Sequence, residues 1–130
     1  MIDRQIERFS AKAQEKALKI FKKSIIDLTS DIISDTPVDT GRLKNNWFPS
    51  VGAVSTETTE ATANEAGDRA EKCAQNELAL DKTFYFTNNL PYAFRIEFEG
   101  WSKVKAPQGM VRRNAIRWKQ IVKRAANATN

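Results

Sequence analysis

The sequence contains no histidine and a single cysteine, Cys73. The absence of histidine excludes Ser-His-Asp and Cys-His catalysis and the usual histidine-based zinc centres. One cysteine excludes an intramolecular disulfide and any zinc site built from several cysteines. Cys73 lies in an Ala-rich stretch, where we expect a small buried hydrophobic residue rather than a nucleophile. We therefore expect no enzymatic activity, no metal site and no cofactor, and the remaining function classes are binding and assembly.

Long apolar runs are also missing. No stretch approaches the ~20 apolar residues that span a bilayer, and the charged first ten residues lack the apolar segment of a secretory leader. Hydrophobic residues make up 41% and charged residues 28% of the 130 positions, which is typical of a globular protein. We expect one domain over residues 1–130 and no association with membranes.

Acidic residues are absent from positions 101–130, which carry eight bases. Since the whole chain has a net charge of +5, the first 100 residues carry a net charge of −3. Within them, residues 27–40 contain four aspartates and no base. An acidic patch and a basic tail of this kind can meet within one subunit or between subunits, although each is more commonly a solvated face.

The first 34 residues predict one long amphipathic helix over residues 2–34. Neither glycine nor proline interrupts it, and apolar side chains recur with a period of 3.6 at Ile6, Phe9, Ala13, Ala17, Ile20, Phe21, Ile25, Leu28 and Ile32. Such a helix is ~50 Å long, longer than the roughly 28 Å expected across a compact chain of this size. It must bend, break or project, and a projecting amphipathic helix needs a partner for its apolar face.

The remaining sequence predicts shorter elements. Pro37 ends the first helix and begins a turn that runs to Gly41. Residues 45–54 predict a strand that Pro49 places at a sheet edge, and residues 82–88 predict a second strand with Phe84 and Phe86 on one face. Residues 61–80 predict a short Ala-rich helix or a mobile arm, and residues 92–98 a short helix or strand.

A second amphipathic helix is predicted over residues 110–126. Its apolar face consists of Val111, Ala115, Trp118, Val122 and Ala125. The predicted fold class is therefore α+β, with a long N-terminal helix and a basic C-terminal helix packed on a small antiparallel sheet.

Two other interpretations stay open at this point. Asp39-Thr40-Gly41 matches the triad of aspartic proteases, whose dimeric retroviral form needs no histidine. However, Arg42 follows the triad, Pro37 precedes it, and those enzymes are all-β, so a turn is the simpler reading. The eight bases of the C-terminal region, with Trp101 and Trp118 among them, also have the composition of a nucleic-acid-binding patch.

The acids Glu97 and Glu99 lie two positions apart. They share a face on a strand but not on a helix. We interpret them as surface or interface charges.

Two blocks of sequence resemble the neck and tail-completion proteins of lambda-like tailed bacteriophages. The first block is Thr36-Pro37-Val38-Asp39-Thr40-Gly41-Arg42-Leu43-Lys44-Asn45-Asn46-Trp47. The second comprises Tyr85-Phe86-Thr87-Asn88-Asn89-Leu90-Pro91-Tyr92-Ala93, Ile96-Glu97, Gly100-Trp101-Ser102 and Ala106-Pro107-Gln108-Gly109-Met110-Val111. Lys105 stands where the family commonly has a glutamine. With the two long helices, the resemblance covers nearly the whole chain.

The resemblance implies a non-enzymatic structural protein of the virion, assembled in the bacterial cytoplasm. Such proteins form a ring at the head–tail junction, for which six-fold symmetry is expected. The implied partners are further copies of the chain and the tail-terminator, head-completion or tail-tube proteins, with non-specific contact to the phage DNA that passes through the neck. Neighbours in a ring make head-to-tail contacts, which can use opposite charges on one subunit.

The interface hypothesis that follows pairs acids with bases of a neighbouring subunit. We expect Asp27, Asp31 and Asp35 to face a basic cluster formed by Arg112, Arg113 and Arg117. Tyr92 and Trp101 are candidate aromatic anchors of the interface. The structural motif residues are expected to shape the turns and corners: Pro37, Asp39, Gly41, Asn88, Asn89, Pro91, Gly100, Pro107 and Gly109.

Overall fold

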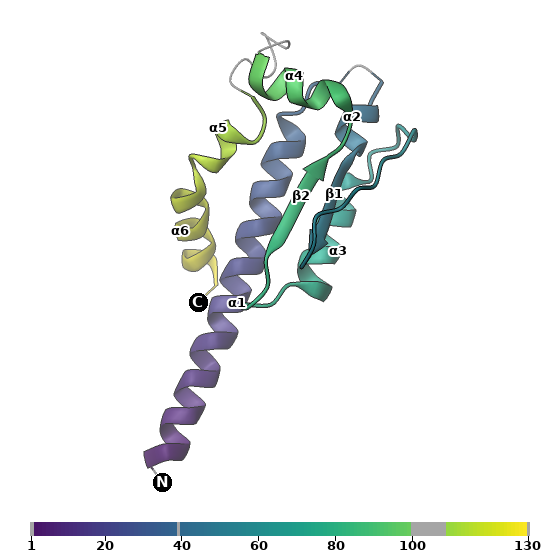
Figure 1. Ribbon diagram of the computed structural model, residues 1–130. Helices are drawn as coiled ribbons and strands as arrows, with labels where there is room; N and C mark the ends of the chain where they lie inside the picture. Colours follow the sequence, from purple (N-terminus) through teal and green to yellow (C-terminus); the bar gives the residue numbers. More distant parts are fainter. Residues whose placement is uncertain (1, 39, 100–108, 130) are drawn as a thin grey trace.

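The computed structural model describes residues 2–38, 40–99 and 109–129, which form six helices and two strands (Figure 1). In chain order these are α1 (Ile2–Ser34), α2 (Arg42–Asn45), β1 (Trp47–Val51), α3 (Ala66–Glu77), β2 (Phe84–Asn88), α4 (Pro91–Glu99), α5 (Arg112–Ala115) and α6 (Trp118–Ala128). The strands form a two-stranded antiparallel sheet. The α+β fold with long first and basic last helices is therefore confirmed.

Helix α1 is continuous over 33 residues and forms the axis of the molecule. Its C-terminal half packs against α3, α5 and α6, whereas residues 2–17 are all exposed and project from the body as an arm (Figure 1). The helix ends at Ser34. Just beyond it, the Thr36 hydroxyl donates to the Ile32 carbonyl at 2.7 Å, and Pro37 follows. Of the alternatives for the long helix, projection is the one that the structure shows.

The sheet pairs residues that are far apart in the sequence. Trp47 lies opposite Asn88 and Val51 opposite Phe84. The rings of Phe84 and Phe86 lie 6.4 Å apart on one face of β2, as its alternating pattern predicts. Phe86 also stacks on Trp47, with ring centroids 5.0 Å apart. This stacking connects the sheet to the core beside the C-terminal end of α1.

Two apolar clusters form the core. The larger one lies near the C-terminal end of α1 and consists of Ile32, Ile33, Leu43, Trp47, Ala66, Leu90, Ala93, Ile96 and Met110. The smaller one contains Ile25, Ala74 and Leu78, with Val51, Phe84 and Trp118 packed against it. Both clusters use the C-terminal half of α1, which leaves the arm without apolar neighbours among the described residues.

The C-terminal helix differs from its prediction. Instead of one helix over 110–126, the chain forms α5 and α6 with a turn at Ile116 and Arg117. The predicted apolar face is wrong in its first turn, where Val111 and Ala115 are exposed, and it omits the fully buried Ile121. Its later members hold, since Ala125 is buried and Trp118 packs against the smaller cluster. The buried side runs through Met110, Asn114, Ile121 and Ala125. The apolar pattern missed it because one of its members is a buried polar residue.

Three other elements are shorter than predicted. The first strand covers 47–51 rather than 45–54, because Asn45 belongs to α2 and Gly52 has a φ of +90°. The Ala-rich helix covers 66–77, and the second strand covers 84–88. Residues 91–99 form a helix rather than a strand.

In the described part of the chain, no helix combines the length and apolar character needed to cross a bilayer.

Candidate functional site

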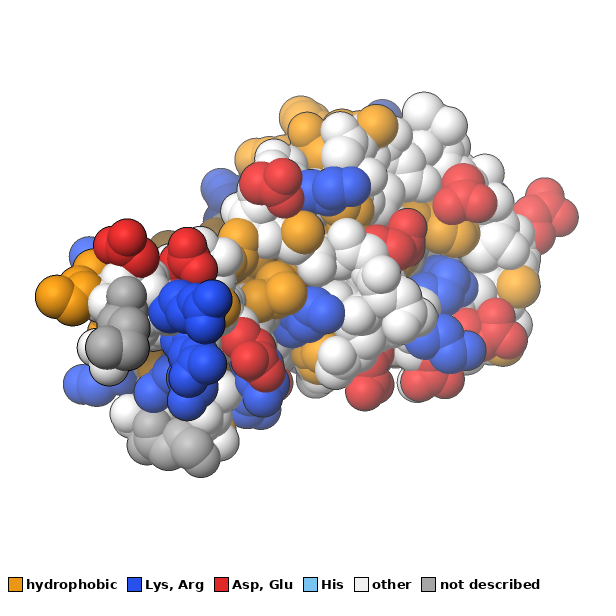
Figure 2. All heavy atoms as spheres, turned by 90° about the horizontal axis from the view of Figure 1, so that it is seen from below, with side chains coloured by type: hydrophobic (Ala, Val, Ile, Leu, Met, Phe, Trp, Pro, Cys, Tyr) orange, Lys and Arg blue, Asp and Glu red, His pale blue; other side chains and the backbone are white. Residues whose placement is uncertain are grey.

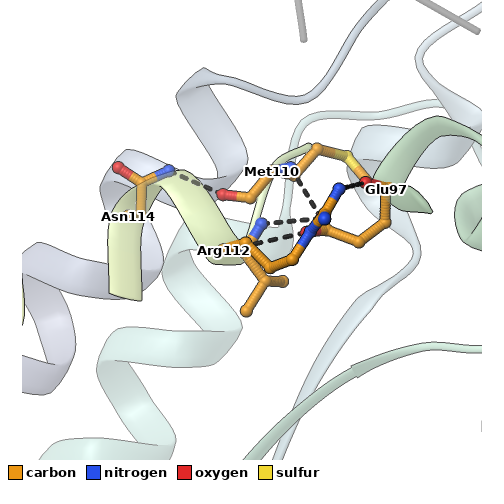
Figure 3. Close-up of polar contacts among 5 residues, drawn as sticks. Glu97, Met110, Arg112 and Asn114 are labelled. Carbon is orange, nitrogen blue, oxygen red and sulfur yellow. Dashed lines mark hydrogen bonds and ion pairs between the residues drawn. The ribbon is translucent and has the colours of Figure 1, made fainter. Parts of the chain in front are cut away.

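The described residues of the second motif block converge at one corner of the molecule, between α4 and α5. Leu90, Ala93, Ile96 and Met110 are buried in the larger apolar cluster. Glu97 extends from the same helix toward the residues that open α5 (Figure 3). We refer to this region as the α4–α5 corner.

Glu97 is the centre of the corner and is buried, with its side chain only 8% exposed. Its Oε1 accepts hydrogen bonds from the backbone amides of Met110 at 2.6 Å and Val111 at 2.8 Å. Its Oε2 accepts from the Arg112 amide and the Arg112 Nε, both at 3.0 Å, and the Arg112 Nη2 donates to the Glu97 carbonyl. One carboxylate therefore binds three consecutive backbone N–H groups and a guanidinium (Figure 3). The interpretation of Glu97 as a surface or interface charge is wrong.

The surroundings of Glu97 keep it ionised. Burial raises the pKa of its carboxyl, but the hydrogen bonds from Val111, Arg112 and Met110 outweigh burial, so the pKa lies below its ordinary value. Gly109 makes this close approach possible. It has a φ of +86°, and a Cβ at this position would lie 2.7 Å from the Glu97 Cδ and 2.8 Å from the Glu97 carbonyl oxygen. Glu97 and Gly109 are therefore one structural unit.

Asparagines hold the chain that enters the corner. The Asn88 Oδ1 accepts from the Leu90 amide at 3.2 Å, and its Nδ2 donates to the Leu43 carbonyl at 2.9 Å. The Nδ2 of Asn89 donates to two carbonyls of the loop after β1. Pro91 occupies the first position of α4, where a missing N–H costs nothing. These motif residues shape the turn, as expected.

An apolar groove lies beside the corner. It has a volume of about 380 Å³, and the Leu90, Phe94, Phe98, Met110 and Val111 side chains are among those that line it. Leu90 and Met110 are buried, while Phe94 and Phe98 are 61% and 56% exposed. We call this feature the α4 groove. Tyr92, the candidate anchor, is half-buried and packs against the core.

The acidic patch and the basic tail meet within the chain at Asp35. Its Oδ2 lies 3.5 Å from the Arg113 Nε and accepts a hydrogen bond from the Asn114 Nδ2 at 2.9 Å. Asn114 also donates to the Met110 carbonyl at 2.7 Å. The contacts expected of Arg112 and Arg113 with a neighbouring subunit are therefore made inside one chain, by Glu97 and Asp35. They join α5 to the end of α1.

The other members of the charge hypothesis lie apart from these pairs. The Asp27 Oδ2 lies 3.6 Å from the Nζ of Lys23, which is one turn earlier on α1. Asp31 is half-buried beside a hollow of about 350 Å³ that Arg124 of α6 also lines. Arg117 is exposed at the turn before α6. A role for Asp31 and Arg117 between subunits stays a prediction.

The first motif block packs under α1. The Trp47 Nε1 donates to the Thr36 hydroxyl at 2.9 Å, and Gly41 has a φ of +90° beside the Thr62 carbonyl. The Thr40 hydroxyl accepts a hydrogen bond from the Arg42 amide at 3.3 Å, a contact that is typical of a turn. Asp39, Gly100, Trp101 and Pro107 lie outside the described residues.

Arg69 of α3 was not among the residues predicted from the sequence to have a role. Its Nη2 donates to the Trp47 carbonyl at 3.0 Å and to the Asn45 carbonyl, and its guanidinium lies 4.3 Å from the Phe48 ring centroid. Burial lowers the pKa of Arg69, while nearby Glu65 and Glu57 raise it. Arg69 therefore fastens α3 to β1. One base in a mixed-charge helix carries no pattern that could have revealed this role.

Possible metal ligands and the Cys73 thiol are two kinds of described group that bear on chemistry. Within residues 2–38, 40–99 and 109–129, no group of three or more His, Cys, Asp or Glu side chains could hold a metal ion. Cys73 is buried, and burial together with the hydrogen bond and charge of Glu77 raises the pKa of its thiol to about 12. An unreactive thiol of this kind suits a structural position.

Comparison with known proteins gave no relative. No protein-family model, curated protein or solved structure matches the chain.

Proposed function

We propose that this chain is a non-enzymatic structural subunit that assembles with copies of itself into a ring, as a neck or tail-completion component of a tailed bacteriophage. The phage assignment is supported by the two motif blocks, which resemble that family. The ring would form in the bacterial cytoplasm and remain in the virion, next to tail-terminator, head-completion or tail-tube proteins.

The observation that carries the proposal is the exposed arm. Residues 2–17 of α1 lie outside the body, and their apolar side chains have no cover from the rest of the described chain. A lone helix of this length is marginal in water. An extended, partly apolar helix is explained by a partner that covers it, and assembly provides one.

The α4 groove is a second apolar surface. Phe94 and Phe98 stand exposed on α4 with ring centroids 4.8 Å apart. Exposed neighbouring aromatic residues are typical of protein–protein interfaces. Two separate apolar surfaces on one subunit suit a head-to-tail assembly, in which each subunit contacts two neighbours through different faces.

The test is the mass and symmetry of the purified protein, from light scattering and negative-stain imaging over a range of concentrations and at low and high salt. We expect closed rings of one copy number. Monomers under all these conditions would contradict self-assembly into a ring.

Binding to nucleic acid is the second candidate. It is favoured by the exposed bases Arg117, Lys119, Lys123 and Arg124 around α6, and Figure 2 shows basic side chains gathered toward the side that holds the arm and the C-terminal end. If this is the main function, affinity for DNA falls with salt, with a logarithmic slope of about −0.9 per phosphate contact. Absence of binding at low salt would exclude it.

A further inference from the structure

The arm presents a defined apolar face. Ile2, Ile6 and Phe9 are 72%, 61% and 75% exposed. Their spacing of four and three residues places them on one side of the helix. The same side continues through Ala13, while Arg4 and Arg8 lie away from it at 100° per residue. The first turns of α1 are thus a short amphipathic helix without a cover.

The α4 groove provides a second apolar surface. Its floor is formed by the buried side chains of Leu90 and Met110, and its walls include exposed Phe94 and Phe98. Helices that bind in apolar grooves use anchors at positions i, i+4 and i+7. Ile2, Ile6 and Phe9 have this spacing.

The arm of a chain cannot reach its own groove. The groove floor packs with Ile32 and Ile33 at the C-terminal end of α1. The rise of 1.5 Å per residue separates Phe9 from Ile32 by ~35 Å along a continuous helix. Figure 1 shows the N-terminus and α4 at opposite ends of the molecule. A second copy is therefore the source of an arm with this spacing.

The edge of the groove adds aromatic and apolar surface rather than a free charge. The Arg112 guanidinium lies 4.8 Å from the Phe98 ring centroid, and its side chain is half-exposed. Its charge is paired with Glu97, so docking rests on the apolar anchors of the arm. In a pair of arms, the large apolar side chains Ile2, Ile6 and Phe9 would cover only about two of the arm's turns, which is too short an apolar seam for a stable coiled coil.

We propose that residues 2–9 of one subunit dock in the α4 groove of a second copy, with Ile2, Ile6 and Phe9 as the anchors. This inference rests on the proposed ring function and specifies its contact. The contact is head-to-tail, because each subunit supplies an arm to one neighbour and a groove to the other.

The test uses one variant for each surface. Phe9→Asp damages the arm, and Phe94→Asp damages the groove; both positions are exposed, so the fold should tolerate the changes. Each variant alone should be monomeric, with the dissociation constant of the contact raised about 100-fold or more, since an aromatic anchor is lost and a charge is buried. Gln14→Asp on the polar side of the arm and Ile116→Asp on another exposed apolar residue are the matched controls, which should assemble normally.

Mixing the two variants gives the sharpest result. Phe9→Asp keeps a sound groove and Phe94→Asp keeps a sound arm, so an equimolar mixture should form dimers with one chain of each kind, measured by light scattering. Assembly of Phe94→Asp alone would overturn the proposal in favour of arm–arm pairing. If both variants form rings like the unmodified chain, docking is wrong while the ring function stands. If the unmodified chain forms no ring, the ring function itself fails.

Discussion

At the residue scale, the organising group is a single buried carboxylate. Glu97 binds three consecutive amides at the start of α5 and the Arg112 side chain. A charge is tolerated in the interior when hydrogen bonds replace its lost hydration. Glu97 thus ties α4 to the start of α5, and the positive φ of Gly109 leaves room for it.

Replacing Glu97 by glutamine should destabilise the protein by about 2–3 kcal/mol at pH 7, because a charge-assisted acceptor is lost. The folded-state pKa of Glu97 lies below its ordinary value, so its contribution is complete above the unfolded-state pKa of about 4.3. It disappears as the pH falls through the folded-state pKa. Denaturant unfolding curves measured from pH 7 to pH 2.5 should show that the free energies of unfolding of the two proteins converge in acid.

The matched control for this measurement is Glu99→Gln on the same helix. Glu99 is exposed, so its removal should change the free energy of unfolding by less than about 0.5 kcal/mol. A parallel pH dependence in unmodified protein and Glu97→Gln would show that the Glu97 contacts contribute little.

Cys73 allows a second residue-scale prediction. With its thiol buried and its pKa raised to about 12, the thiolate that reacts with alkylating reagents is scarce at pH 8. We expect the native protein to be labelled at least ~100-fold more slowly than the protein in guanidinium chloride, with the extent of labelling followed by mass spectrometry. Equal rates would contradict the buried position.

At the scale of elements, apolar periodicity predicted the helices and strands whose apolar pattern is not interrupted by polar side chains. The 33 residues of α1 and the two phenylalanines on one face of β2 follow from pattern. The length of α1 predicted that it bends, breaks or projects, and only the structure selects projection. The division into α5 and α6 does not, because Asn114 occupies the buried side and bonds to Asp35, 79 positions away. The same holds for Glu97 and Arg69, whose partners are backbone groups that no local pattern reveals.

Asn114→Ala should therefore cost about 1–3 kcal/mol, since the Met110 carbonyl and the Asp35 carboxylate each lose a donor. Ile116→Ala is the control, because Ile116 is exposed at the turn between the two helices and should leave the stability unchanged. Thermal melts would measure both variants. A neutral Asn114→Ala would mean that the Asn114 hydrogen bonds contribute little and that Glu97 and the Arg113–Asp35 pair hold α5.

At the scale of the whole molecule, the two ends of α1 differ in character. One end is surrounded by α3, α5 and α6, while the other carries an uncovered apolar face. The charges that could have joined subunits at Asp35 are instead used inside the chain. Apolar surfaces rather than the acidic patch are thus the stronger support for the proposed assembly.

The most direct test of the account compares the mass of the full chain with that of a chain that begins at residue 17, by light scattering at matched concentrations. Residues 2–16 are exposed, so their removal should leave the body folded, with an unchanged near-ultraviolet circular dichroism spectrum. We predict a closed ring for the full chain and a monomer for the shortened one. If the full and the shortened chain have the same number of subunits per particle, whether one or many, the claim that the arm builds the assembly is contradicted.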